Sequence, residues 1–98
     1  MRLIFAKEAK EDLIRIGDAI AQFNPLRAIS FIDELAAKCE VLKHSPLIYS
    51  LVPGHETEGI RRIVHGNNLI FYRTHDDRVE VLHVLHGAMN YQRVLFPE

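Results

Sequence analysis

Several side chains in the second half of this sequence are of types that bind anions or transfer protons. They are Arg61, Arg62, Arg73, His83, His86 and Tyr91. Arginine carries a fixed positive charge that binds phosphate or carboxylate groups. Histidine titrates near neutral pH, so His83 or His86 is the natural candidate for proton transfer. These residue types have the chemistry to cleave a phosphodiester, and the arginines alone could hold carboxylates of a protein partner.

The overall charge does not favour binding to nucleic acid. The chain has 98 residues, with 12 Lys and Arg against 13 Asp and Glu, which gives a net charge of -1. The segment 45–58 contains no Lys or Arg. Proteins that bind nucleic acid through its phosphates usually carry a strong positive field. We therefore expect neither sequence-specific nucleic-acid binding nor attachment to an anionic membrane.

The cysteine and the histidines do not indicate a metal site or another cofactor. The six histidines are spread over several predicted elements, and no pair has helical i, i+4 spacing. The single cysteine, Cys39, cannot form an internal disulfide, and we interpret it as a small core residue. No signal-peptide core or bilayer-spanning apolar run is present. These features predict a cytoplasmic protein.

The first half of the chain predicts a short strand and two amphipathic helices. A strand is expected over 2–5 and helices over 6–22 and 25–43. The apolar positions of the first helix are Ala9, Leu13, Ile16 and Ile20, and its charged positions, expected to face solvent, are Lys7, Glu8, Lys10, Glu11, Asp12, Arg15 and Asp18. The apolar positions of the second are Ala28 or Ile29, Ile32, Leu35, Ala36, Cys39 and Leu42.

Local signals mark where the helices begin and end. Asn24 and Pro25 suit the cap and the first position of a helix, and Ser45-Pro46 stops it. The loop 45–58 follows, and after it the hydrophobic period changes to two. Strands are then expected over 60–65, 68–73 and 78–86.

These three strands predict an antiparallel meander in a single domain covering residues 1–98. The last strand is apolar on both faces, with Val79, Val81, His83 and Leu85 sharing one face, so it should lie near the sheet centre. The fold class is α+β, a helical hairpin packed on an antiparallel sheet in the order β-α-α-β-β-β. Strand alternation places Arg61 and Arg62 on opposite faces, so at most one shares a side with Arg73.

Several of these residues also have a purely structural interpretation. His83 lies in phase with apolar strand residues and suits a hydrogen-bonded core histidine. His86 precedes Gly87 at a strand end, where it could cap the turn or belong to a binding surface. Each arginine could form an ordinary surface ion pair with Glu80 or Glu58.

Six segments, taken in their order and spacing, resemble one known family. They are A-x-x-D-L-x-x-I at 9–16, Asn24-Pro25, Phe31-Ile32, G-I-R-R at 59–62, L-I-F-Y-R at 69–73 and V-E-V-L-H-V-L-H-G-A at 79–88. The chain resembles the ParE branch of the RelE/ParE toxins of bacterial toxin-antitoxin modules. The L-x-x-L-H-G-A ending is the most specific of these segments.

The resemblance implies a small toxin that is neutralised by a ParD-like antitoxin in a hetero-oligomer, with DNA gyrase as the target. Arginines on neighbouring strands are then candidates for contacting the antitoxin, namely Arg61, Arg62 and Arg73. In the family the C-terminal segment is tied to toxicity, which makes Tyr91, Arg93, Leu95 and Phe96 the candidates for contacting the target. Such a toxin acts by binding and is not an enzyme.

Two alternatives remain open. RelE-type relatives cleave mRNA on the ribosome, and in this chain Arg62, Arg73, His86 and Tyr91 would be the residues to supply that chemistry. A relative that binds antitoxin but has lost its toxicity would show the same sequence features. A growth assay separates the toxic protein from the inert one.

Overall fold

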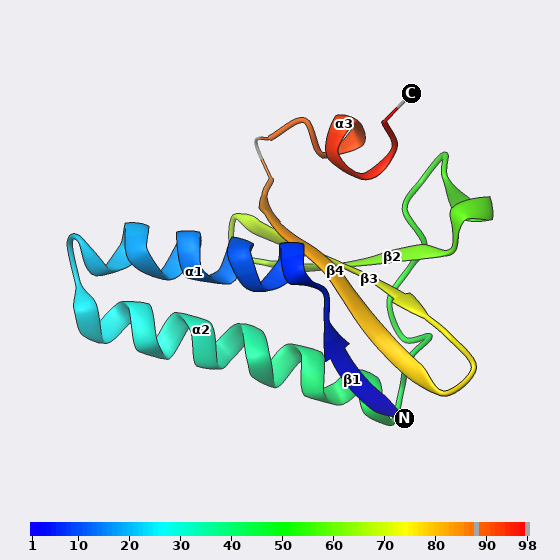
Figure 1. Ribbon diagram of the computed structural model, residues 1–98, viewed down its shortest axis with the longest axis horizontal. Helices are drawn as coiled ribbons and strands as arrows, with labels where there is room; N and C mark the ends of the chain where they lie inside the picture. The colour runs from blue at the N-terminus through cyan, green and yellow to red at the C-terminus, as the bar shows by residue number, and fades with distance from the viewer. Residues whose placement is uncertain (88, 98) are drawn as a thin grey trace.

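The computed structural model describes residues 1–87 and 89–97. Its elements are β1 (Arg2–Phe5), α1 (Lys7–Ala21), α2 (Pro25–Glu40), the 3-10 turns η1 (Val41–Lys43) and η2 (Glu56–Glu58), β2 (Ile60–His65), β3 (Asn68–Thr74), β4 (Arg78–His86) and α3 (Tyr91–Leu95). The helical hairpin α1–α2 covers one face of the sheet, and α3 lies on the other (Figure 1). None of the described helices has the length and apolar character that a membrane crossing needs.

The two long helices begin and pack as the sequence predicts. Asn24 caps α2, because its Oδ1 accepts a hydrogen bond from the backbone N–H of Arg27 at 3.0 Å, and Pro25 occupies the first helical position. The choice between Ala28 and Ile29 for the buried stripe is settled in favour of Ala28, since Ile29 is 62% exposed. Phe31, which was not assigned to the stripe, is also buried.

The sheet is mixed, with strand order β1-β4-β3-β2. The antiparallel meander β2–β3–β4 is confirmed, and β4 lies inside the sheet as expected. The expectation of a wholly antiparallel sheet is wrong, because β1 pairs with β4 in parallel, with Leu3 beside Val79. The helix α1 leads the chain away from the end of β1, and α2 brings it back to the sheet, so that β2 runs in the same direction as β1 (Figure 1). Two hairpin turns follow, and β4 therefore again runs parallel to β1.

Each face of the sheet has its own hydrophobic core. The core under α1 and α2 includes Ala9, Phe31, Leu35, Cys39, Leu42, Ile63, Ile70, Tyr72, Val79, Val81 and Val84. The smaller core on the opposite face consists of Val52, Ile60, Phe71 and Leu85, covered by Leu69, Leu82, Tyr91, Leu95 and Phe96. We call the first side the helix side and the second the tail side. The C-terminal residues therefore complete a second core.

A register shift in β4 changes which residues face each core. Tyr72 pairs with Val81 and Phe71 pairs with His83, so Leu82 has no partner on β3. The extra residue reverses the alternation of side chains beyond it. Leu85 consequently belongs to the tail side, and the expectation that it shares a face with Val81 is wrong.

Gly17 lies within α1 at the crossing with α2, and we predict that Gly17→Ala stabilises the protein. A Cβ at this position would lie 3.7 Å from Ile32 Cγ1, an ordinary van der Waals distance. Alanine restricts the unfolded chain more than glycine does, so the free energy of unfolding should rise by about 0.5–1 kcal/mol in urea denaturation.

The matched control is Gly59→Ala. Gly59 has φ of 73°, a left-handed conformation that costs alanine about 1 kcal/mol or more. This second variant should therefore be destabilised. If Gly17→Ala also loses stability, the helices do not have the room at their crossing that the structure shows.

Candidate functional site

The structure brings two of the three candidate arginines together on the tail side of the sheet. Arg62 lies opposite Phe71, and Arg73 lies opposite Ile60, in the antiparallel pairing of β2 with β3. Phe71 and Ile60 both belong to the tail-side core. Residues that face each other across an antiparallel pair project to the same side. Arg62 is therefore the arginine that shares a face with Arg73.

Arg62 is tied to the C-terminal tail. Its Nη1 donates a hydrogen bond to the hydroxyl of Tyr91 at 3.1 Å. The Tyr91 ring in turn packs against Phe71, with ring centroids 5.1 Å apart. This contact joins a candidate antitoxin residue to a candidate target residue in a single cluster.

Arg73 has a different environment. Within residues 1–87 and 89–97 its guanidinium forms no hydrogen bond or ion pair, and the residue is half-buried. Its possible partner Glu80 instead lies 3.0 Å from Nε2 of His75, and Glu58 lies 3.6 Å from Nδ1 of His55. The predicted pairing of Arg73 with either glutamate is thus not formed. Glu80 is the cross-strand neighbour of Arg73, but its carboxylate is engaged with His75. A half-buried guanidinium that forms no ion pair suits an acidic group of a partner.

Arg61 and His86 lie apart from this cluster. Arg61 Nη1 donates to the backbone carbonyl of Tyr49 at 2.7 Å, so it is held by the loop that precedes β2. His86 follows Leu85, a tail-side residue, and strand alternation directs it to the helix side. The four residues proposed for cleaving RNA therefore do not converge on one face.

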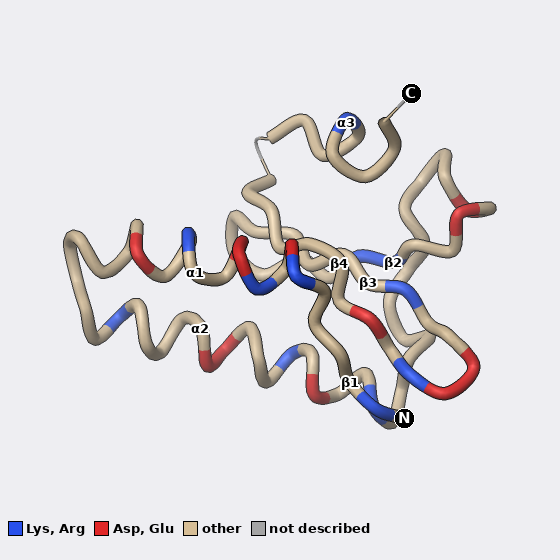
Figure 2. Tube along the Cα trace, viewed as in Figure 1, with Lys and Arg blue, Asp and Glu red and all other residues tan. Residues whose placement is uncertain are grey.

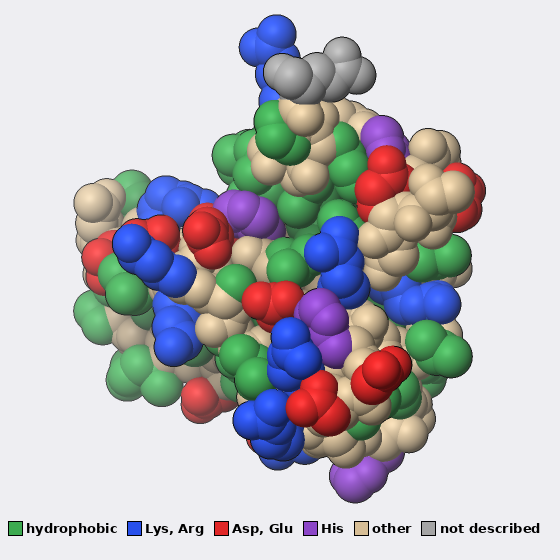
Figure 3. Space-filling view, turned by 45° about the vertical axis from the view of Figure 1, so that its right-hand side comes forward, with side chains coloured by type: hydrophobic (Ala, Val, Ile, Leu, Met, Phe, Trp, Pro, Cys, Tyr) green, Lys and Arg blue, Asp and Glu red, His purple; other side chains and the backbone are tan. Residues whose placement is uncertain are grey.

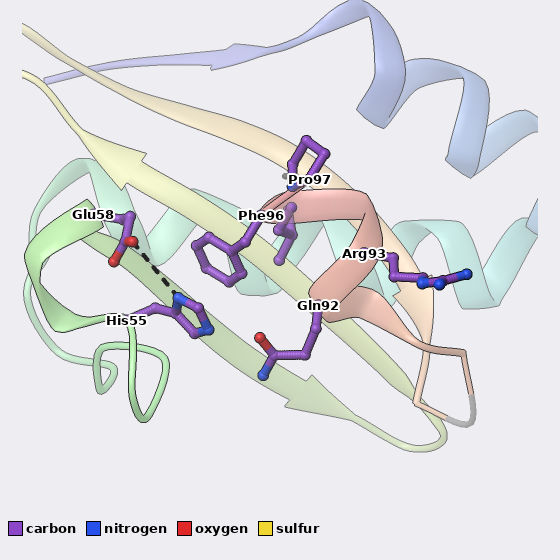
Figure 4. Close-up of a pocket in the computed structure, with 7 residues that line it drawn as sticks. His55, Glu58, Gln92, Arg93, Phe96 and Pro97 are labelled. Atoms are coloured by element: carbon purple, nitrogen blue, oxygen red, sulfur yellow. Dashed lines mark ion pairs between the residues drawn. The ribbon is translucent and has the colours of Figure 1, made fainter.

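The candidate target residues of the C-terminal tail differ in their solvent exposure. Leu95 and Phe96 are half-buried against the tail-side core, whereas Arg93 is exposed. Phe96 stacks on His55 with ring centroids 3.7 Å apart and an interplanar angle of 5° (Figure 4). Next to this stack is an open cleft, lined by His55, Glu58, Gln92, Arg93, Leu95, Phe96 and Pro97.

Asp12 is a buried acidic residue whose role the sequence interpretation missed. It is 5% exposed, so its assignment to the solvated face of the first helix is wrong. Its Oδ2 accepts a hydrogen bond from the backbone N–H of Val84 at 2.9 Å and lies 2.8 Å from Nδ1 of His83. Its Oδ1 accepts from Arg15 at 3.0 Å. The sequence contains a signal for this burial, because Asp12 lies three positions after Ala9 and four before Ile16, on the same face of the helix as these apolar residues.

The carboxylate of Asp12 replaces β1 as a hydrogen-bond acceptor for β4 beyond the point where β1 ends. β1 ends at Phe5, which pairs with Val81, while β4 continues to His86. Beyond Phe5 the N–H groups on that side of β4 need another acceptor, and Asp12 provides one. His83 is thereby a hydrogen-bonded structural histidine, which agrees with its structural interpretation.

The structure also shows how Cys39 and the possible metal ligands are placed in the described part of the chain. Cys39 is 1% exposed, and burial raises the pKa of its thiol to about 11, so it is a core residue as predicted. No group of three or more His, Cys, Asp or Glu residues in ranges 1–87 and 89–97 has an arrangement that could hold a metal ion.

A family model described as the ParE toxin of the type II toxin-antitoxin system parDE matches residues 3–91. The chain belongs to the ParE toxin family. This confirms the resemblance seen in the six sequence segments. The matched range includes Arg62, Arg73 and Tyr91 but ends before the three other tail candidates.

A solved structure shares the fold of this ParE family member. It is titled "Chromosomal ParDE TA system from P. aeruginosa" and aligns with a TM-score of 0.76 at 17% identity. The alignment covers 88% of this chain and 95% of that chain. At such low identity the likeness supports the α+β architecture alone. A comparison with curated proteins gave no significant match.

Proposed function

We propose that this ParE family toxin arrests bacterial growth by binding DNA gyrase in the cytoplasm and is neutralised by a ParD-like antitoxin in a hetero-oligomer. The family match over residues 3–91 is the observation that carries the proposal. A mechanism by binding is also supported by the site, since Arg62 is engaged with Tyr91 and His86 projects from the other face. The proposed target contacts are Tyr91, Arg93, Leu95 and Phe96.

The antitoxin is proposed to wrap around both sides of the sheet. Its acidic groups would meet Arg73 and Arg62 on the tail side, and Arg61 where the loop before β2 leaves it accessible. On the outer surface of the helical hairpin, Ile14 and Ile29 are 65% and 62% exposed. An amphipathic helix that folds on binding would cover these apolar side chains.

The sheet edges differ in their availability to an added antitoxin strand. The start of β2 is occupied, because Val52 N–H donates to the carbonyl of Ile60 and Arg62 N–H donates to that of Ser50. In the described residues β1 pairs with β4 on one side and with no strand on the other. We propose the outer edge of β1 for such a strand.

The proposed function is tested by inhibition of gyrase supercoiling with purified toxin, with and without antitoxin. Toxin alone should inhibit, and a stoichiometric amount of antitoxin should restore activity. Induced expression should stop growth, break DNA and leave mRNA intact. Codon-dependent mRNA cuts that vanish in His86 or Tyr91 variants would instead support the ribonuclease alternative.

We predict that Arg73→Glu weakens antitoxin binding by about tenfold or more. The half-buried guanidinium forms no ion pair in the free toxin and is proposed to meet an acidic group of the antitoxin, so reversing its charge places like charges together in the complex. Titration calorimetry measures the affinity, and binding of the parent should show a strongly negative heat-capacity change because a disordered segment folds.

Lys38→Glu, on the side of α2 opposite Ile29, provides a control with the same change of net charge away from the apolar surface proposed for the antitoxin helix. It should bind antitoxin within about twofold of the parent. Unchanged affinity of the Arg73→Glu variant would show that Arg73 lies outside the interface.

A further inference from the structure

The cleft beside the tail is built from two parts of the chain that are far apart in sequence. One wall comes from η2 and the residue before it, with His55 and Glu58, and the other comes from α3 and its end, with Gln92 and Phe96 (Figure 4). Loop 45–58 has no assigned role in binding. The cleft nevertheless makes this loop a neighbour of three of the four candidate target residues, Arg93, Leu95 and Phe96.

Contacts within the cleft hold its shape before any partner arrives. His55 is stacked face to face on Phe96, and its Nδ1 lies 3.6 Å from a Glu58 carboxylate oxygen. Leu95 and Phe96 are anchored in the tail-side core below. Side chains that are already ordered lose less conformational entropy when a partner binds. The cleft is thus a prearranged surface with an apolar floor.

The charges at the cleft indicate what kind of group it accepts. The side chain of Glu58 is 41% exposed, and loop 45–58 has no Lys or Arg to neutralise it. Acidic residues lie on η2, while Arg93 is on α3, with its guanidinium directed away from His55 (Figures 2 and 4). Hydrophobic side chains gather below the tail, beside a histidine and acidic groups (Figure 3). A carboxylate on one wall repels phosphate and attracts a basic side chain.

We propose that this cleft receives a segment of the protein target that presents a Lys or Arg to Glu58 and an apolar side chain to Leu95, Phe96 and Pro97. His55 and Glu58 are then specificity-determining residues of the target interface. The inference rests on the proposed function of target binding and adds loop residues to the tail residues already named. An open cleft with an apolar floor and a polar rim suits a peptide segment.

The test compares Glu58→Lys with Glu56→Lys, which changes the same charge on the same turn. Glu56 does not line the cleft in the described residues. Surface plasmon resonance measures affinity for gyrase, and calorimetry with antitoxin checks that each variant is folded. Glu58→Lys should weaken gyrase binding at least tenfold and Glu56→Lys by less than twofold. A second variant, His55→Ala, should weaken it about fivefold.

The outcomes separate this inference from the proposed function. If Glu58→Lys binds gyrase with the parent's affinity, the proposed role of the cleft is wrong, and gyrase remains the target. If the parent does not bind gyrase, the proposed target is wrong. The role of the cleft is then tested by measuring growth arrest on expression of each variant. Loss of growth arrest in Glu58→Lys but not in Glu56→Lys would support the proposed role of the cleft. Equal arrest by both variants, or no arrest by the parent, would overturn it.

Discussion

Replacing Asp12 by alanine is expected to lower the free energy of unfolding by about 3 kcal/mol. The carboxylate is buried and accepts from the backbone N–H of Val84 and from Arg15, with His83 at 2.8 Å. Its removal leaves the buried N–H of Val84 without an acceptor at the point where β1 has ended. Urea denaturation of the purified protein measures the effect.

Two further variants show whether the hydrogen bonds cause this loss. Asp18→Ala removes an exposed carboxylate from the same helix and should change stability by less than about 0.5 kcal/mol. Asp12→Asn keeps an acceptor for Val84 but no charge, so it should lie between alanine and the parent. A loss below about 1 kcal/mol in Asp12→Ala would mean that this carboxylate does not stabilise the edge of β4.

The second large effect is expected for Phe71→Ala, at about 3–5 kcal/mol of lost stability. Phe71 is fully buried at the centre of the tail-side core, and Tyr91 packs against its ring. Removing the ring creates a cavity and takes away the surface against which Tyr91, the first residue of α3, packs. The tail should therefore undock more often, in addition to the global loss of stability.

Trypsin measures the undocking, because Arg93 lies within α3 and is cleaved when the helix opens. Cleavage after Arg93 should be much faster in Phe71→Ala than in the parent. Val64→Ala serves as the control, since Val64 lies on β2 and is 58% exposed. If cleavage after Arg93 is unchanged in Phe71→Ala, the tail does not depend on the second core for its position.

The sequence alone determined the local elements of this protein. Both helices follow from the three- and four-residue recurrence of apolar positions, and the start of α2 follows from Asn24-Pro25, whose cap is formed. The meander follows from the two-residue period and from the turn at Gly66, where φ is 59°. These features depend on residues close together in the chain, so their patterns are visible without the fold. The same periodicity established that Arg61 and Arg62 project to opposite faces.

The tertiary structure alone decided how these elements combine and which side chains meet. The parallel pairing of β1 with β4, the burial of Asp12 under the end of β4 and the stack of Phe96 on His55 join residues about 40 to 80 positions apart. The extra residue at Leu82 reverses the faces of one strand within an otherwise regular apolar pattern. Such contacts arise because each buried polar group and apolar face must find a partner somewhere in the folded chain, and a local pattern does not specify which one.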